Sequence, residues 1–188
     1  MITPNHLTGL RILIAFASPL LLIWHRSIVS ELIILFLFTI ACITDWWDGY
    51  LARKKSMVTR IGKLVDPIAD KLLILGLMLT FSRFELYTFE WIVFIFMREL
   101  TITIARLVNL KKGKVIPAEW AGKVKVGFQI GSIYATLLFL LAFDSGLFWK
   151  PAAVILFVFQ SIHYLGIFLA TIVTMTSGVI FFHRLSQT

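Results

Sequence analysis

Cysteine and acidic residues are both scarce in this sequence of 188 residues. Cys42 is its one cysteine, so an intramolecular disulfide is excluded. Aspartate and glutamate together number 10 against 18 lysines and arginines, which gives a formal net charge of +8. Hydrophobic residues make up 59% of the chain, above the roughly 45–50% of a typical soluble domain. We therefore expect one membrane domain over residues 1–188, with no room for a separate soluble domain.

Apolar runs recur along the whole sequence, and each is long enough to cross a hydrocarbon core of about 30 Å as a helix. They cover residues 7–24, 30–50, 66–82, 88–109, 124–142 and 152–181. The expected fold is therefore an all-α integral membrane protein, a bundle of six transmembrane helices joined by short loops. His163 in the last run has no identifiable partner, and we expect a structural or interface role for it.

Basic residues gather on one side of such a bundle. That side receives Arg53, Lys54, Lys55, Arg60, Lys63, Lys111, Lys112, Lys114, Lys123, Lys125 and Arg184. The opposite side holds Arg26, Arg83 and Lys150 among Glu31, Glu85, Glu90 and Asp144. The positive-inside rule then places both termini in the cytoplasm. Such basic loops orient a membrane protein and attract anionic lipid headgroups, so we expect no nucleic-acid partner.

Two prolines predict where helices begin. Thr3 followed by Pro4 is typical of a helix start, with a capping hydroxyl and then proline at the first helical position. Pro67 directly follows Asp66, and because proline is tolerated in a first helical turn, it predicts that the third helix begins beside Asp66.

Polar residues also mark the first apolar run. Asn5, Thr8 and Arg11 recur at a spacing of three, so they share one side of a helix. They form either an interfacial polar face, with the Arg11 side chain reaching back to water, or part of a functional site. The spacing favours neither interpretation.

Four of the ten acidic residues lie within residues 45–70. Asp45 and Asp48 are three apart, and Asp66 and Asp70 are four apart, so each pair shares one face of a helix. The two helices run antiparallel, which brings the pairs together at the cytoplasmic side. Carboxylates beside a bilayer are costly unless cations neutralise them, and their oxygens suit Mg²⁺ or Mn²⁺. The spacing predicts a divalent-metal active site, in which two ions about 3.5–4 Å apart would hold a phosphoryl group.

Small residues between these carboxylates leave space beside the two helices. Gly49 and Ala52 flank Asp48 without bulk, and Gly62 does the same before the second pair. We expect a nucleotide or pyrophosphate to lie there. Arg53 either contacts a substrate phosphate or pairs with a neighbouring aspartate.

Other functions fit the acidic cluster less well. Intramembrane prenyltransferases also bind pyrophosphate through magnesium and aspartates, but they usually need well-separated motifs and more helices. An ion carrier would need a matching acidic site near the opposite face, and none is visible in the sequence. Carboxylates merely solvated at helix ends, balanced by Arg53, Lys54 and Lys63, do not explain the spacing of the whole set.

Residues 45–70 carry the pattern D-x2-D-G-x2-A-R-x8-G-x3-D-x3-D. This pattern resembles the signature of the CDP-alcohol phosphatidyltransferase family. The resemblance implies that Asp45, Asp48 and Asp66 hold the metal ions, and that Asp70 contacts metal and also acts as the general base. It also implies a homodimer that binds CDP-diacylglycerol, with its acyl chains in the bilayer.

Further segments resemble the family members that use sn-glycerol 3-phosphate as the acceptor alcohol. These are residues 4–11 (PNHLTGLR), 44–46 (TDW), 66–71 (DPIADK), 98–99 (RE) and 120–129 (WAGKVKVGFQ). Val126 departs from the threonine that is common at its position. The resemblance implies transfer of the phosphatidyl group from CDP-diacylglycerol to glycerol 3-phosphate, with release of CMP. Phosphatidylglycerol, inositol phosphate and serine remain alternative acceptors.

An anionic acceptor needs its own cationic pocket. Arg98 and Arg106 are eight apart in the fourth apolar run, about 80° apart around a helix. An arginine as deep as Arg98 must face protein, water or a ligand, so it either binds phosphate or pairs with Glu99 or an aspartate. The resemblance favours Lys123 and Lys125 as further ligands, although their spacing of two points them to different sides.

The site of action is expected to be a membrane rather than the aqueous cytoplasm. The sequence begins close to its first apolar run without a transit-like extension. We therefore expect a multi-pass protein of a bacterial cytoplasmic membrane rather than a mitochondrial one.

Overall fold

The computed structural model describes residues 4–55, 62–111, 120–145 and 153–186, and within them the side chains of 9–45, 69–109, 120–145, 157–158 and 160–186. These ranges form helices and short turns without a strand. The helices are α1 (Pro4–Trp24), α2 (Ile28–Lys55), α3 (Gly62–Arg83), α4 (Phe89–Lys111), α5 (Trp120–Asp144) and α6 (Ala153–Leu185). Each predicted apolar run coincides with one of them, so the all-helical fold is confirmed over the described residues.

The predicted helix starts are right for α1 and wrong for α3. Helix α1 begins at Pro4, as the capping pattern indicates. Helix α3 begins at Gly62, so Pro67 lies in its second turn rather than its first. A proline this close to a helix start removes a single backbone hydrogen bond, to the carbonyl of residue 63, and the helix continues through it.

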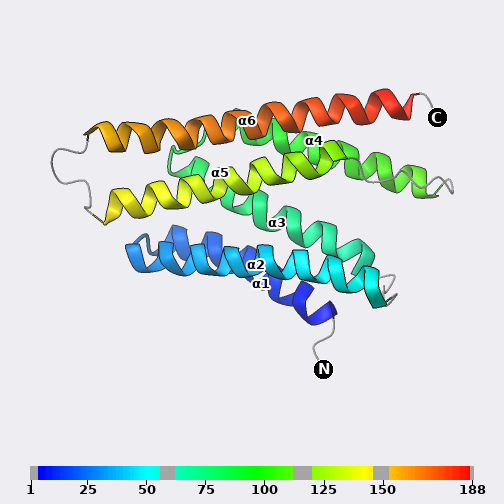
Figure 1. Ribbon diagram of the computed structural model, residues 1–188, viewed down its shortest axis with the longest axis horizontal. Helices are drawn as coiled ribbons and strands as arrows, with labels where there is room; N and C mark the ends of the chain where they lie inside the picture. Colours follow the sequence, from blue (N-terminus) through cyan, green and yellow to red (C-terminus); the bar gives the residue numbers. More distant parts are fainter. Residues whose placement is uncertain (1–3, 56–61, 112–119, 146–152, 187–188) are drawn as a thin grey trace.

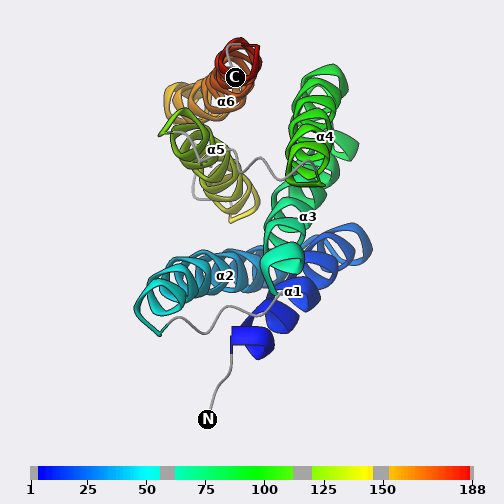
Figure 2. The ribbon, with the colours of Figure 1, turned by 90° about the vertical axis from the view of Figure 1, so that its right-hand side faces the viewer.

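Helix α3 occupies the centre of the bundle. It packs against α1 on one side and against α4 and α5 on the other, while α6 covers α4 and α5 (Figure 2). The first turn of α1, the last turns of α2 and α4 and the end of α6 lie toward the same end, on the right in Figure 1. Successive helices therefore alternate in direction, as the sequence predicts, and the helix ends that carry Lys55, Lys111 and Arg184 share one end of the bundle.

Three helices are long and apolar enough to cross a membrane within the described residues. These stretches are Ile28–Asp45, Trp120–Asp144 and Gln160–Leu185, and Gly9–Trp24 is a shorter apolar helix. Helix α4 carries Arg98, Glu99 and Arg106 along its length, and these charges reduce its apolar character. The predicted six spans therefore go beyond what length and composition establish.

The turn between α3 and α4 is fastened to α5 and α6. The Tyr87 hydroxyl lies 2.9 Å from the carbonyl oxygen of Ser132 and 2.7 Å from Thr136 Oγ1. His163 is buried, with Nε2 3.3 Å from the carbonyl oxygen of Leu86 and its ring 4.8 Å from that of Phe139. His163 is thus a packing residue, in agreement with the structural role expected for it.

Gly76 allows α1 and α3 to approach closely. A Cβ atom at this position would lie 3.3 Å from Pro19 Cγ and 3.5 Å from the carbonyl oxygen of Ala15. Small residues at helix contacts permit such backbone proximity. Because Arg11 precedes Ala15 by one turn, the contact also fixes where Arg11 lies relative to α3.

We predict that Gly76→Leu destabilises the protein by about 1–3 kcal/mol, because the added side chain must push α1 away from α3. The measurement is thermal unfolding in detergent micelles. Gly131→Leu is the matched control, since a Cβ atom at Gly131 has no neighbour within 4 Å and the residue is exposed. Equal melting temperatures for the two variants would contradict the prediction.

Candidate functional site

Arg11 joins the first three helices at the site. Its Nη1 atom lies 2.7 Å from Asp70 Oδ1 of α3 and 3.2 Å from Asp45 Oδ1 of α2. The Arg11 side chain is 2% exposed, whereas those of Asp45 and Asp70 are 54% and 36% exposed. Arg11 therefore does not reach back to water: it is buried and holds two carboxylates beside each other, so the interfacial interpretation is wrong and a part in the site stays a prediction.

The remaining residues of the acidic motif lie on the same two helices. Asp48, Gly49, Ala52 and Arg53 belong to α2, and Gly62 and Asp66 belong to α3. Their side chains fall outside the described set, so their roles stay predictions.

The described carboxylates suit a hard cation without completing a site for one. Asp45 Oδ1 and Asp70 Oδ1 both contact Arg11 Nη1, and both belong to partly exposed side chains. Carboxylate oxygens of this kind are suitable ligands for Mg²⁺ or Mn²⁺. Among the described side chains, no three of the acidic, histidine and cysteine type converge on a possible metal position. Completing the ligand set would fall to Asp48 and Asp66, each about one helical turn from a described aspartate.

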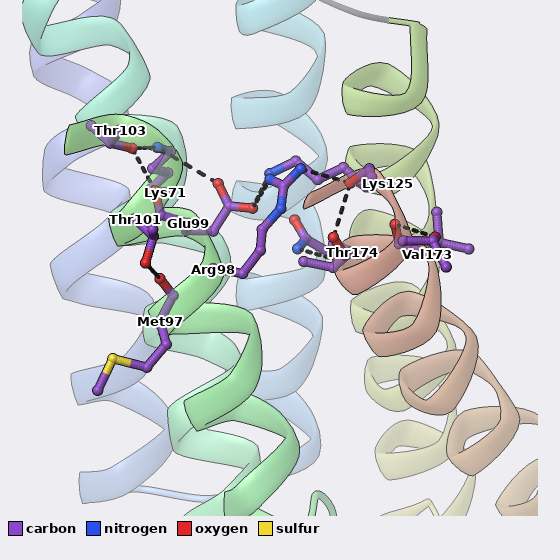
Figure 3. Close-up of polar contacts among 12 residues, drawn as sticks. Lys71, Met97, Arg98, Glu99, Thr101, Thr103, Lys125, Val173 and Thr174 are labelled. Carbon is purple, nitrogen blue, oxygen red and sulfur yellow. Dashed lines mark hydrogen bonds and ion pairs between the residues drawn. The ribbon is translucent and has the colours of Figure 1, made fainter. Parts of the chain in front are cut away.

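A second polar cluster surrounds Glu99 on α4 (Figure 3). Glu99 Oε1 accepts a hydrogen bond from Arg98 Nη1 at 2.9 Å and another from the Lys125 ammonium of α5. Lys71 of α3 lies on the other side, with Nζ 3.6 Å from Glu99 Oε2, and donates to the Thr103 hydroxyl. Three cations from three helices thus share one buried carboxylate, and we call these four charged residues the Glu99 cluster.

Helix α6 supports the Glu99 cluster. Arg98 Nη2 lies 2.6 Å from Ser177 Oγ, whose own hydroxyl donates to the Thr174 carbonyl at 2.9 Å. Gln129 Nε2 of α5 lies 3.1 Å from Thr174 Oγ1. A Cβ atom at Gly178 would come within 3.2 Å of Arg98 Cγ, so the glycine makes room for the arginine.

The predicted acceptor residues divide into buried and exposed members. Arg98 and Lys125 lie inside the cluster, and Arg98 pairs with Glu99 as one of the two interpretations of the sequence foresees. Lys123 is exposed, so the two lysines point to different sides as their spacing predicts. Arg106 is exposed and its guanidinium lies 5.6 Å from the centre of the Phe181 ring.

Adjacent residues of α3 link the Glu99 cluster to the group formed by Arg11, Asp45 and Asp70. Asp70 points toward Arg11 and α1, whereas Lys71 points toward α4. Two carboxylates with one arginine leave a net negative charge on one side, and three cations with one carboxylate leave a net charge of +2 on the other. The arrangement can hold a cation and an anion next to each other.

Sequence reasoning left several of these contributors unassigned. Lys71, Glu99, Gln129 and Ser177 were not among the candidate site residues. A charged residue within an apolar run is itself a signal of function, and Lys71 and Glu99 both carried it. Gln129 ends the segment 120–129 that resembles the family, whereas Ser177 gives no comparable signal, because single polar residues are common in helices.

These features define a class: an all-helical bundle with long apolar helices and an interhelical site for paired opposite charges. Residues 1–180 match the model of the family described as CDP-alcohol phosphatidyltransferase. The chain belongs to this family, as the motif in residues 45–70 indicates.

Curated relatives resemble the chain over much of its length. A CDP-diacylglycerol–glycerol-3-phosphate 3-phosphatidyltransferase of Bacillus subtilis is 43% identical over 108 residues, covering 57% of this chain and 56% of the relative. A probable phosphatidylglycerophosphate synthase of Mycobacterium tuberculosis is 39% identical over 132 residues, 69% of this chain and 62% of the relative. The matched stretch thus spans less than two thirds of either relative.

We predict that Arg11→Met destabilises the protein by about 2 kcal/mol. Removing one partner of a fully buried ion pair costs about 3–5 kcal/mol, and the partly exposed carboxylates reduce that figure here. The measurement is the melting temperature in detergent. Arg106→Met is the control, because Arg106 is exposed and its guanidinium stacks on the Phe181 ring at 5.6 Å, a contact that contributes about 0.5–1 kcal/mol. The prediction fails if both variants melt alike.

Proposed function

We propose that this chain transfers the phosphatidyl group of CDP-diacylglycerol to sn-glycerol 3-phosphate, giving phosphatidylglycerophosphate and CMP. The observation that carries the proposal is the contact pattern of α3, where Asp70 joins the carboxylates and Lys71 joins the Glu99 cluster. A metal-bound pyrophosphate and a phosphate-bearing alcohol need such neighbouring sites. The names of the Bacillus and Mycobacterium relatives, which describe this reaction or its product, support the assignment.

The proposed setting is a membrane that all six helices cross, with both termini and the site on the cytoplasmic side. Large apolar side chains that are exposed on every helix support it, among them Leu13 (69%), Phe36 (66%) and Val179 (70%). The basic residues that the sequence gathers on one side of the bundle support the orientation. A bacterial cytoplasmic membrane and a homodimer belong to the same proposal.

Four aspartates would hold two Mg²⁺ or Mn²⁺ ions: Asp45, Asp48, Asp66 and Asp70. When bound, such ions neutralise charge on the pyrophosphate and make the phosphorus more electrophilic. Arg11 holds Asp45 and Asp70 beside each other, so that part of the ligand set is preformed. Gly49, Ala52, Arg53 and Gly62 would border the CDP-lipid.

Asp70 is proposed to act as general base. It accepts the proton of the acceptor's primary hydroxyl, whose oxygen attacks the phosphorus on the lipid side of the pyrophosphate. A new phosphorus–oxygen bond forms, the bond to the bridging oxygen breaks, and CMP leaves with that oxygen. The fixed position of Asp70 on α3 determines where the hydroxyl must lie.

The acceptor's phosphate is proposed to bind the Glu99 cluster through Lys71, Arg98 and Lys125. The cluster's net charge of +2 matches a phosphomonoester dianion, which favours glycerol 3-phosphate over serine or phosphatidylglycerol. Arg106 and Lys123, which are exposed, would attract the acceptor from solution.

The decisive test is radiolabelled sn-glycerol 3-phosphate with CDP-diacylglycerol and purified protein in detergent. We expect a labelled lipid and CMP in equal amounts, with loss of both when EDTA removes divalent ions and recovery on adding Mg²⁺. Asp70→Asn should bind CDP-lipid without turnover. CMP release only with another alcohol would assign a different acceptor, and activity unchanged by EDTA would remove the metal from the proposal.

Lys125 and Lys123 form a matched pair on one helix. We predict that Lys125→Met raises KM for glycerol 3-phosphate at least about tenfold, the loss expected for one charge-assisted hydrogen bond. Lys123→Met should raise it about twofold or less, because the exposed side chain contributes only long-range attraction. Steady-state kinetics with varied acceptor give both values. A larger effect at Lys123 would contradict the burial argument.

A further inference from the structure

Glu99 has more charged partners than any other described carboxylate. Its two oxygens contact Arg98 of its own helix, Lys125 of α5 and Lys71 of α3. The residue is 6% exposed, so water contributes little to neutralising these charges. A single carboxylate therefore fixes the relative positions of three cations that the sequence separates widely.

The two lysines of the cluster keep hydrogen-bond donors beyond those that reach Glu99 and Thr103. A lysine ammonium has three donors and an arginine guanidinium five, and neither has an acceptor. The Lys71 side chain is 32% exposed, whereas those of Arg98 and Lys125 are 9% exposed. An anion can approach from the Lys71 side and meet cations whose mutual repulsion Glu99 has already reduced.

We propose that Glu99 is a positioning residue that assembles Lys71, Arg98 and Lys125 into one phosphate pocket and ties that pocket to Asp70 through α3. The inference rests on the proposed function and extends it, because Glu99 acts through the cations rather than on the substrate. Lys71 becomes a phosphate ligand in this arrangement. Since Asp70 is its neighbour in the chain, a phosphate on Lys71 lies at a fixed offset from the base.

The test replaces the carboxylate by an isosteric amide. Glu99→Gln should raise KM for sn-glycerol 3-phosphate about tenfold or more, while KM for CDP-diacylglycerol stays within about twofold of the original. The unequal effect separates positioning from a general loss of structure. Equal rises of both KM values, or an unchanged KM for the acceptor, would overturn the proposal.

Glu31→Gln is the matched control. Glu31 is likewise buried and lies 3.5 Å from an arginine nitrogen, that of Arg26, but in the first turn of α2, apart from the Glu99 cluster. We expect this variant to keep both KM values even if its melting temperature falls. A rise in the acceptor KM of Glu31→Gln that matches the rise in Glu99→Gln would assign the effect to lost packing and overturn the positioning role.

Inorganic phosphate gives a readout that needs no turnover. A ligand that binds only the folded state raises the melting temperature, so phosphate should stabilise the original protein and should stabilise Glu99→Gln much less. Equal shifts in both proteins, or no shift in either, would overturn the proposal. A shift confined to the original protein that then fails to use glycerol 3-phosphate would refute the proposed function and leave the pocket in place.

Lys71→Gln keeps the proposal testable if Glu99→Gln does not fold. The side chain is partly exposed, so its loss should be tolerated. We expect the acceptor KM to rise about tenfold and the phosphate-dependent shift in melting temperature to shrink. An acceptor KM equal to the original would remove Lys71 from the pocket and contradict the proposal.

Discussion

The contact of one buried guanidinium with two carboxylates organises the site. Arg11 cannot be solvated where it lies, so α2 and α3 must bring Asp45 and Asp70 to it. The same contact keeps the two carboxylates close although their charges repel. The packing of α1 against α3 at Gly76 thus positions the acidic half of the site as well as the helices.

Helix α3 also positions the cationic part of the candidate site, the Glu99 cluster, relative to the carboxylates. Residues 70 and 71 are separated by about 100° around a helix, so neighbouring side chains reach different partners. Asp70 meets α1, and Lys71 meets Glu99 and Thr103 on α4. Two groups of opposite charge that would neutralise each other in contact are kept apart by the helix that links them.

The sequence predicted the helices well, and it predicted correctly that Asp45 and Asp70 lie beside each other, because helices and shared helix faces depend on local spacing. Apolar length marks a helix, and carboxylates three or four apart share a face whatever the helix packs against. The partners across helices could not be predicted this way. The surroundings of Arg11 could be described only once its carboxylate partners were located. Likewise, the structure was needed to show that Lys125 is buried and Lys123 exposed.

Two groups of ion pairs in the bundle carry opposite net charge. Near the start of α2, Arg26 pairs with two acids, Glu31 and Asp144, which leaves a net negative charge. At the middle of α3 and α4, Glu99 pairs with three cations, which leaves a net positive charge. Excess charge of one sign attracts mobile ions of the other. The net positive charge of the Glu99 cluster is therefore suited to attract the anionic acceptor of the proposed reaction, beside Asp70 of the family motif.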